Sequence, residues 1–300
     1  MNKVYFGDCR DSMHKMAKEG IKVQTCITSP PYYGLRDYGV DGQIGAEESP
    51  QQFIDALVEV FACVWDVLED DGTLWVNLGD TYSAGGRGAG SKVQSANKGS
   101  VTGNVLGTWK VDGYRPKNLL GMPWRLAFAL QDFGWNLRQD IIWHKPNPMP
   151  ESVTDRCTKA HEYFFLLSKS QKYYFDNKAI QEAANYPNDD RGSRGDGRRG
   201  TECNSMSGKT GDTRNKRSVW TVNTSSFKGA HFATYPIELI EPCILAGSRV
   251  GDIVLDPFFG SGTTGQAAQN LGRKWIGCEL NQNYETLQNE RLQQTAMELI

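Results

Sequence analysis

The stretch Asp252–Gly265, DIVLDPFFGSGTTG, decides the fold of this 300-residue chain. DIVL is a short β-rich run, the turn after it contains Gly260 and Gly262, and Thr263–Leu271 has the pattern of a helix. A strand, a glycine turn and a helix N-terminus in this order are typical of a nucleotide-type binding site. No Lys follows the second glycine, so the turn is not a P-loop.

Two carboxylates accompany this turn. Asp256 ends its strand, and Glu279 ends the next expected strand, Lys274–Cys278. Neighbouring strand ends share a crevice in a doubly wound sheet, and a carboxylate there commonly accepts both hydroxyls of a ribose. Because no Lys or Arg lies inside the turn to meet a phosphate, the pattern favours a cationic ligand, S-adenosylmethionine, over ATP. The alternative is a helix-capping Asp and a surface Glu.

The alternation of strands and helices continues at both ends of the chain. Val23–Thr28, Phe53–Leu68 and Thr73–Leu78 predict a strand, a helix and a strand, which form a βαβ unit with parallel strands and a right-handed crossover. Further helices are expected at Pro123–Gln131, at Pro236–Leu245 and from Gln282 to the end, and further strands at Asp140–Trp143, Glu162–Leu167 and Tyr173–Phe175. We therefore expect an α/β fold with a Rossmann-like, doubly wound and mostly parallel sheet.

Two polar segments interrupt this pattern. Thr81–Gly113 contains eight glycines and almost no apolar residues. Asn185–Arg217 carries eight Lys or Arg against five Asp or Glu, a local charge of +3. Segments of this length without secondary structure are uncommon inside a compact domain and are often functional. The alternative for each is a surface loop without a function.

The composition excludes several classes of protein. With 33 Lys and Arg against 35 Asp and Glu, the net charge of −2 argues against a histone-like DNA packager, so a local patch must meet any acidic partner. No apolar run approaches the ~20 residues that span a bilayer, and the first residues do not form a signal peptide. We expect a cytoplasmic protein with no membrane partner. The seven scattered cysteines and four histidines have neither disulfide-framework nor metal-site spacing, so no metal is expected.

A second informative stretch, Thr28–Tyr32 (TSPPY), ends the first strand of the βαβ unit. Pro30 and Pro31 fix φ and remove two N–H donors, and the carbonyls there are free to accept from a ligand. A site that accepts both N–H protons of a base amine, through Ser29 Oγ and the Pro30 carbonyl, favours a pyramidal nitrogen whose lone pair points at a methyl donor. Tyr32 would stack on a base that has left the duplex. Taken alone, the segment favours a Pro-Pro loop with a packed tyrosine over a catalytic role.

Together these motifs resemble those of the N4-cytosine/N6-adenine DNA methyltransferases of the β class, in which the catalytic motif comes first. Ile27–Tyr32 resembles the catalytic motif, and Asp256–Thr263 resembles the cofactor motif. Gly7–Cys9 resembles the amino-terminal motif, and Asp140–Asn147 resembles the strand and loop that line the target-base pocket. His231–Pro236 resembles the segment before the first cofactor helix. The resemblance implies the class I S-adenosylmethionine-dependent methyltransferase fold, S-adenosylmethionine as cofactor and double-stranded DNA as partner. The implied catalytic residues are Ser29, Pro30, Pro31 and Tyr32, and the implied cofactor-binding residues are Asp8, Asp256, Pro257, Phe258, Gly260, Gly262, Thr263 and Glu279.

The resemblance also divides the chain. Residues 1–180 are expected to form the catalytic half of the core with the glycine-rich insert 81–113, and residues 218–300 the cofactor-binding half of the same core. Residues 185–217 are the candidate DNA target-recognition insert, whose Arg side chains would pair with phosphates and read guanine edges. Arg36, Arg138 and Lys145 are candidate phosphate contacts, and Trp143 and Trp220 are candidates for either the base pocket or the core.

The implied activity is site-specific transfer of a methyl group to an exocyclic amine of a flipped DNA base. Because the catalytic tetrapeptide begins with Ser29, cytosine N4 is favoured over adenine N6. One alternative is an RNA-base or protein-glutamine methyltransferase, but those normally place the cofactor motif before the catalytic one. Another is a non-catalytic DNA-binding regulator of the same fold, which intact Ser29, Tyr32, Asp256 and Glu279 speak against. A homodimer and a companion restriction endonuclease stay open.

Overall fold

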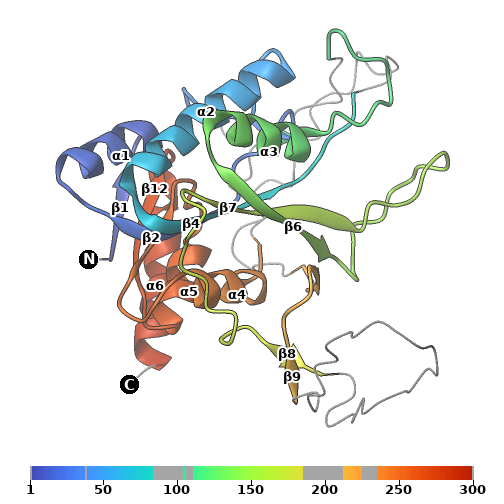
Figure 1. Ribbon diagram of the computed structural model, residues 1–300. Helices are drawn as coiled ribbons and strands as arrows, with labels where there is room; N and C mark the ends of the chain where they lie inside the picture. The colour runs from blue at the N-terminus through green and yellow to red at the C-terminus, as the bar shows by residue number, and fades with distance from the viewer. Residues whose placement is uncertain are drawn as a thin grey trace, which may run out of the picture.

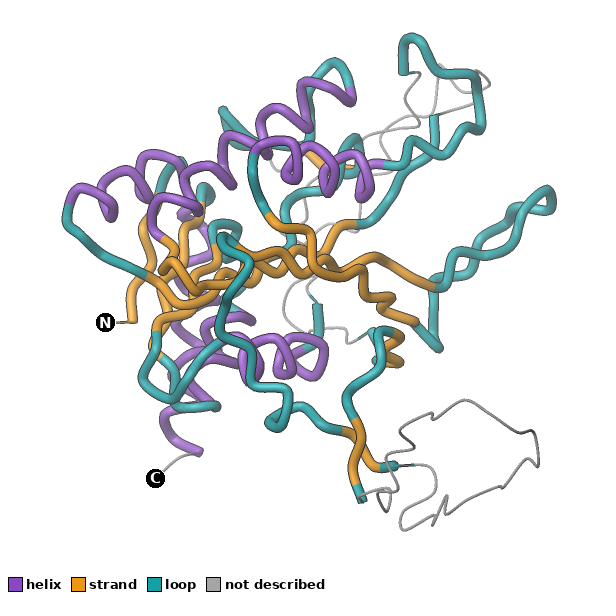
Figure 2. The backbone as a smooth tube through the Cα atoms, viewed as in Figure 1, coloured by secondary structure: helices purple, strands orange, loops and turns teal. Residues whose placement is uncertain are grey.

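An eight-stranded sheet forms the middle layer of the computed structural model, which describes residues 2–37, 39–83, 104–105, 111–184, 212–224 and 235–298. Helices cover both faces of this sheet (Figures 1 and 2). The strands of the sheet, in spatial order, are β1 (Asn2–Phe6), β12 (Lys274–Glu279), β11 (Ile253–Asp256), β2 (Val23–Thr28), β4 (Leu68–Leu78), β7 (His161–Ser168), β6 (Asn136–His144) and β10 (Val219–Thr221).

The sheet is doubly wound and mostly parallel, as expected. Among its described strands, only β7 runs antiparallel to its neighbours, β4 and β6. From β2 the chain crosses through α2 (Pro50–Val67) to β4, whereas from β11 it crosses through α5 (Thr263–Asn270) to β12 on the other side. The adjacent strands β2 and β11 therefore flank the point where the strand order reverses, which is where open α/β sheets bind ligands.

The helices form two layers. One face of the sheet carries α1 (Cys9–Lys18), α2 and α3 (Met122–Phe133), and the other carries α4 (Ile237–Gly247), α5 and α6 (Glu285–Glu298), which follows a short 3-10 turn at Gln282–Tyr284 (Figure 1). Within the described residues, no helix is both long and apolar enough to cross a membrane.

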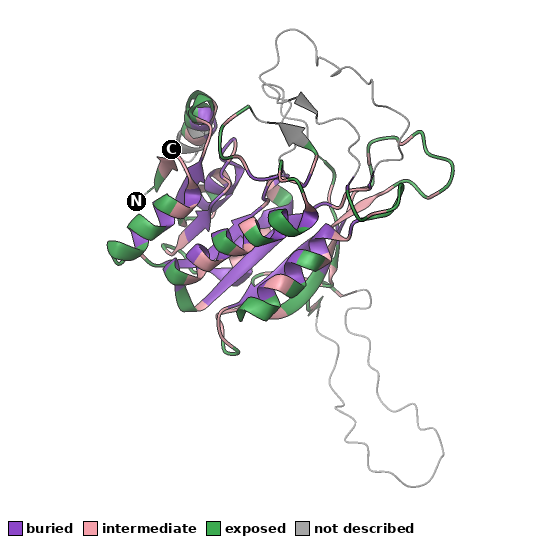
Figure 3. Cartoon of the chain, turned by 90° about the horizontal axis from the view of Figure 1, so that it is seen from above, coloured by how far each residue is buried: buried purple, intermediate pink, exposed green. Residues whose placement is uncertain are grey.

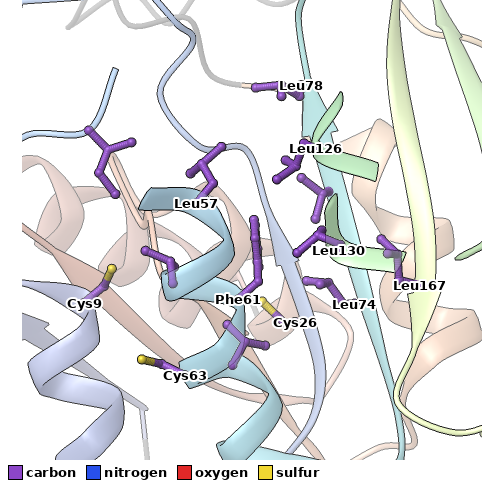
Figure 4. Close-up of a cluster of buried hydrophobic side chains, with 14 of the residues drawn as sticks. Cys9, Cys26, Leu57, Phe61, Cys63, Leu74, Leu78, Leu126, Leu130 and Leu167 are labelled. Carbon is purple, nitrogen blue, oxygen red and sulfur yellow. The ribbon is translucent and has the colours of Figure 1, made fainter. Parts of the chain in front are cut away.

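The α2 helix shows how the sequence builds one of these layers. Ser49 caps its N-terminus: Ser49 Oγ accepts from the Gln52 N–H and the Gln52 side chain accepts from the Ser49 N–H, while Pro50 occupies the first turn. Its apolar face is fully buried, with Leu57 and Phe61 packed over the sheet among leucines of β4, β7 and α3 (Figure 4). The central strands β2, β4, β11 and β12 are among the most buried elements of the described residues (Figure 3).

Most of the expected elements are present, but a strand at Tyr173–Phe175 is not. This segment is a loop whose backbone bonds to two different elements: Tyr174 N donates to Asp71 O (2.8 Å) and Asp176 N to Ala246 O (2.9 Å). The Phe175 ring packs on Trp75, with centroids 6.3 Å apart. Isolated bonds of this kind replace a strand ladder. The structure also contains β1, α1 and β10, which the periodicity did not reveal.

The two halves of the core share one sheet. β1, from the amino-terminal half, pairs with β12, and β10, from the carboxyl-terminal half, pairs with β6. Most of the glycine-rich insert and residues 185–211 of the candidate recognition insert lie outside the described residues. Where described, the first insert contributes β5 (Asn104–Val105), which pairs with β3 (Arg36–Asp37), a few residues after Ser29–Tyr32. β8 (Glu182–Ala183), just before the second insert, pairs with β9 (Thr213–Arg214), which lies in the described part of that insert, to form a two-stranded ribbon.

Candidate active site at the carboxyl ends of the strands

A pocket lies at the carboxyl ends of β2, β11 and β12, over the point where the strand order reverses. All four implied catalytic residues line this pocket, and so do seven of the eight implied cofactor-binding residues. The eighth, Gly262, stands between two lining residues, Ser261 and Thr263, and is the N-cap of α5. The fold therefore brings together two motifs that are more than 200 residues apart in sequence.

Asp256 lies at the end of β11 and is 3% exposed. One carboxylate oxygen accepts from Thr28 Oγ1 (2.6 Å) and Phe258 N (3.0 Å); the other accepts from Thr264 Oγ1 and from the Tyr235 hydroxyl (3.2 Å). Burial raises the pKa of Asp256, and these hydrogen bonds oppose the rise. The carboxylate thus organises the turn that follows it and ties that turn to β2.

Glu279, at the end of β12, is fixed by two backbone donors. Gly260 N donates to Oε2 at 2.7 Å and Asn281 N donates to Oε1 at 2.8 Å. Burial raises the pKa of this carboxyl to about 7, against the effect of those backbone bonds. Each carboxylate oxygen keeps a lone pair, and the residue lines the pocket, so the geometry fits a pair of ribose hydroxyls.

The glycine turn needs its glycines for conformation. Gly260 has φ +51° and Gly262 has φ +86°, a region that side-chain-bearing residues rarely adopt. No side chain among the described residues caps α5, so the first N–H groups of this helix are open to a ligand. Beneath the turn, buried Arg291 of α6 donates to Ser261 Oγ (2.8 Å) and Thr263 Oγ1. The resulting positive helix end suits the carboxylate of an amino-acid ligand.

Asp8 lines the pocket at the end of β1, where its neighbour Gly7 N donates to the Glu279 carbonyl at 2.9 Å. It caps α1 by accepting from Arg10 N (2.8 Å), and its carboxylate pairs with the Arg10 guanidinium at 2.6 Å. This pairing holds the pKa of Asp8 below its usual value. Arg10 also pairs with Glu59 of α2, so the ion pair fixes the pocket wall against the helix layer.

The candidate catalytic segment, Ser29–Tyr32, is held by Asn77 of β4. Ser29 Oγ donates to Asn77 Oδ1 at 3.3 Å, and the Tyr32 hydroxyl lies 3.2 Å from the same oxygen. The amide orientation is set because Asn77 Nδ2 donates to the Tyr163 carbonyl (3.0 Å) and to Glu162 Oε2 (3.4 Å). With the proton of Ser29 directed to Asn77, lone pairs of Ser29 Oγ stay available to accept from a ligand.

Sequence reasoning missed several residues that support the site. All but Thr264 contact a motif residue more than 20 positions away in sequence, as Asn77 and Tyr235 do. The only feature of the sequence that could have indicated Asn77 and Tyr235 is their position, because each lies near a strand end or within a motif segment. The supporting residues are Thr28, Asn77, Glu162, Tyr235, Thr264 and Arg291.

The remaining candidates have other places. Trp143 and Trp220 face each other in the register of β6 and β10 and are both buried in the core. Lys145 is ion-paired with Glu162. Arg138 lies near the start of β6, six positions before His144 at the carboxyl end of that strand, which is about 20 Å along the strand. Its side chain donates to the Tyr173 hydroxyl. The Arg36 side chain and residues 231–234 lie outside the described part of the chain.

The chain belongs to the DNA methylase family of N6 and N4 methyltransferases, whose model matches residues 23–290. It is 50% identical over 273 residues to Type II methyltransferase M.Cfr9I of Citrobacter freundii, covering 90% of this chain and 81% of that protein. It is 47% identical over 291 residues to Type II methyltransferase M.SmaI of Serratia marcescens, covering 97% and 90%.

Solved structures share the fold. PvuII DNA methyltransferase (cytosine-N4-specific) matches with a TM-score of 0.65 and 19% identity over 97% of this chain and 86% of that one. The M1.HpyAVI–S-adenosylmethionine complex matches with a TM-score of 0.56 and 18% identity over 97% and 100%. The protein is thus a site-specific DNA amino-methyltransferase that uses S-adenosylmethionine and acts on cytosine N4 or adenine N6.

Proposed function

We propose that this enzyme methylates cytosine N4 in duplex DNA, with Ser29 and the Pro30 carbonyl accepting the two N–H protons of the amine. The observation that carries the proposal is that Ser29 lines the same pocket as the glycine turn and Glu279, while its proton is directed to Asn77 Oδ1. The hydroxyl therefore offers lone pairs, as an amine donor requires. The tetrapeptide Ser29–Tyr32 begins with Ser, and the resemblance to the family then favours cytosine N4 over adenine N6 as the target.

The cofactor, when bound, supplies an electrophilic methyl group on a sulfonium. Glu279 would hold its ribose hydroxyls, Asp8 would lie near its adenine, and the N-terminus of α5 would meet its carboxylate. Asp256, Pro257 and Phe258 shape the wall between this ligand and the catalytic segment. The chain's own contribution to the chemistry is to orient the amine lone pair, because accepted N–H bonds favour a pyramidal nitrogen.

Tyr32 would stack on the extruded base, since a base amine inside a duplex is out of reach of the pocket. Residues 185–217 would contact the DNA and read its sequence. Within the described part of that segment, Arg214 and Arg217 are both paired with Glu182 at the base of the ribbon. The recognition role would therefore fall to residues 185–211, which carry the other basic residues apart from Lys216.

The curated relatives are named Type II methyltransferases. We propose that this enzyme likewise protects the recognition site of a companion restriction endonuclease, in the cytosol where the DNA lies. A homodimer is a further hypothesis. Expression of the chain in a host, followed by digestion of its DNA with endonucleases of different specificity, tests the first point, and sedimentation of the purified protein tests the second.

One experiment decides the target base. Duplex DNA incubated with the enzyme and S-adenosylmethionine is digested to nucleosides and analysed by mass spectrometry. We expect N4-methyldeoxycytidine. N6-methyldeoxyadenosine would overturn the assignment of cytosine and leave the family membership intact.

A further inference from the structure

A buried acidic residue outside the catalytic segment reaches into it. Glu162 is the second residue of β7, whose antiparallel direction brings its first residues to the carboxyl ends of the parallel strands. Glu162 Oε2 accepts a 2.8 Å hydrogen bond from the Tyr32 hydroxyl, 130 residues earlier. Glu162 Oε1 accepts from Lys145 Nζ at 2.5 Å, in a pair whose side chains are 14% and 17% exposed.

The ring of Tyr32 is supported from behind by a glycine. A Cβ placed on Gly79 would lie 2.4 Å from Tyr32 Cε2 and 2.8 Å from Cδ2, so the ring rests on the Gly79 backbone. Tyr32 also lines the pocket. The hydroxyl donates to Glu162 Oε2 and lies 3.2 Å from Asn77 Oδ1, so both ends of the side chain are constrained while it stays accessible from the pocket.

The ion pair between Glu162 and Lys145 is poorly explained as a source of folding stability. Removing two charges from water costs about as much as their attraction returns, so a buried pair rarely stabilises more than apolar packing would. A fixed carboxylate is, however, a strong acceptor for a phenol hydroxyl. Lys145 also lies 4.1 Å from the Trp143 ring centroid, which anchors the pair to the core.

We propose that Glu162 is a positioning residue for base extrusion: held by Lys145, it fixes the Tyr32 ring in the orientation that stacks on the flipped base. The inference rests on the proposed role of Tyr32. Stacking on an aromatic ring depends on the two planes lying parallel. A tyrosine already fixed by its hydroxyl and by Gly79 loses less side-chain entropy when the base arrives.

The test uses Glu162→Gln, Tyr32→Phe and their double variant, with Asp155→Asn as a matched control. Asp155 is an exposed carboxylate in the connection between β6 and β7, and it forms an ion pair with Lys117. The Asp155→Asn substitution therefore also removes one ion pair. Four quantities are measured: kcat, KM for DNA, Kd for S-adenosylmethionine, and the fluorescence of a duplex with 2-aminopurine beside the target base.

We expect Glu162→Gln and Tyr32→Phe each to lower kcat about tenfold and to weaken the extrusion signal. Cofactor Kd should stay within about twofold, and Asp155→Asn should behave as wild type. The double variant should be no worse than the poorer single variant, because Glu162 is expected to act only through the Tyr32 hydroxyl, which Tyr32→Phe removes. Additive losses, or wild-type kcat in Glu162→Gln, would overturn the inference.

Gly79→Ala keeps the inference testable if Glu162→Gln does not fold. Its methyl group would displace the Tyr32 ring without touching the ion pair, so it should lower kcat and the extrusion signal and leave cofactor Kd unchanged. A Gly79→Ala variant with normal extrusion would contradict the inference. Wild-type enzyme that transfers no methyl group to DNA would refute the proposed function itself.

Discussion

Thr28 Oγ1 donates a 2.6 Å hydrogen bond to Asp256 Oδ1, and the two residues are 228 positions apart in the chain. Thr28 is the last residue of β2 and immediately precedes Ser29; Asp256 is the last residue of β11 and opens the glycine turn. One side-chain contact therefore joins the candidate catalytic segment, Ser29–Tyr32, to the glycine turn that we propose binds the cofactor. A substitution at Thr28 is therefore expected to affect both Ser29–Tyr32 and the glycine turn.

Thr28→Val tests this contact. Valine has the same shape but leaves buried Asp256 with one donor fewer, so we expect a loss of about 1–3 kcal/mol in the free energy of unfolding and weaker cofactor binding. Urea unfolding and calorimetric titration with S-adenosylmethionine measure the two effects. Thr28→Ser, which keeps the hydroxyl, should behave nearly as wild type; equal behaviour of Val and Ser would show that the hydrogen bond is dispensable.

Asp256 and Tyr32 are expected to differ in role although both line one pocket. Asp256→Ala removes the acceptor for four donors and should abolish cofactor binding. Tyr32→Ala should leave cofactor Kd largely unchanged and depress turnover, because its expected contact is with the base. A Tyr32→Ala variant that failed to bind cofactor and kept turnover would reverse these assignments.

Cofactor affinity should depend on pH through Glu279. Its pKa in the folded protein is raised to about 7, and ribose hydroxyls donate to the ionised form, so binding favours loss of a proton. Affinity should rise about 5- to 10-fold between pH 6 and pH 8 as Glu279 ionises. Titrations across this range measure it. Glu279→Gln should bind more weakly and lose this part of the slope; identical slopes would exclude Glu279 as the titrating group.

Gly262→Ala should lower both the stability of the protein and its affinity for the cofactor. Its φ of +86° disfavours any side chain, and a Cβ would lie 3.4 Å from the Phe259 ring, so we expect a stability loss of about 1–2 kcal/mol and weaker cofactor binding. Gly20→Ala is the matched control, because Gly20 has φ +70° in open space away from the pocket. The control should lose stability alone. Equal cofactor affinity in both variants would remove Gly262 from the site.

DNA binding should weaken steeply with salt, through a few local ion pairs rather than an overall positive charge. Replacing Arg191, Arg194, Arg198 and Arg199 by Gln should lower the slope of log K against log salt by about 0.9 for each phosphate that the variant no longer neutralises. Fluorescence anisotropy with a labelled duplex at several salt concentrations measures this slope. An unchanged slope would place the DNA-binding residues elsewhere in the chain.

The parts of the molecule that follow from short-range pattern were predictable. The glycine turn, the Pro-Pro segment and the strands β2, β11 and β12 are recognisable because each depends on a few consecutive residues. Their convergence on one edge followed from the rule that parallel strands end together, and the strand order bears this out.

The supporting side chains were not predictable in the same way. Asn77 reaches Ser29 and Tyr32 because β4 pairs in parallel with β2, and Glu162 reaches Tyr32 because β7 runs antiparallel to β4, which brings its first residues to the same edge of the sheet. Nothing in a single sequence states which strands pair. The prediction of a strand at Tyr173–Phe175 was wrong for a related reason. Phe175 packs against Trp75 of the sheet, as a strand residue would, but the backbone of the segment forms no continuous ladder with any described strand.

The ribbon of β8 and β9 has a consequence for how such enzymes diversify. Ala183 and Thr213 are register partners, so the chain leaves the core and returns to it at a single point. An insertion whose two ends are hydrogen-bonded neighbours can change in length and composition without moving any strand of the main sheet. We therefore expect the segment between them to be exchangeable: grafting it from a relative that reads a different sequence should transfer target preference while the methyl-transfer residues of the core stay the same.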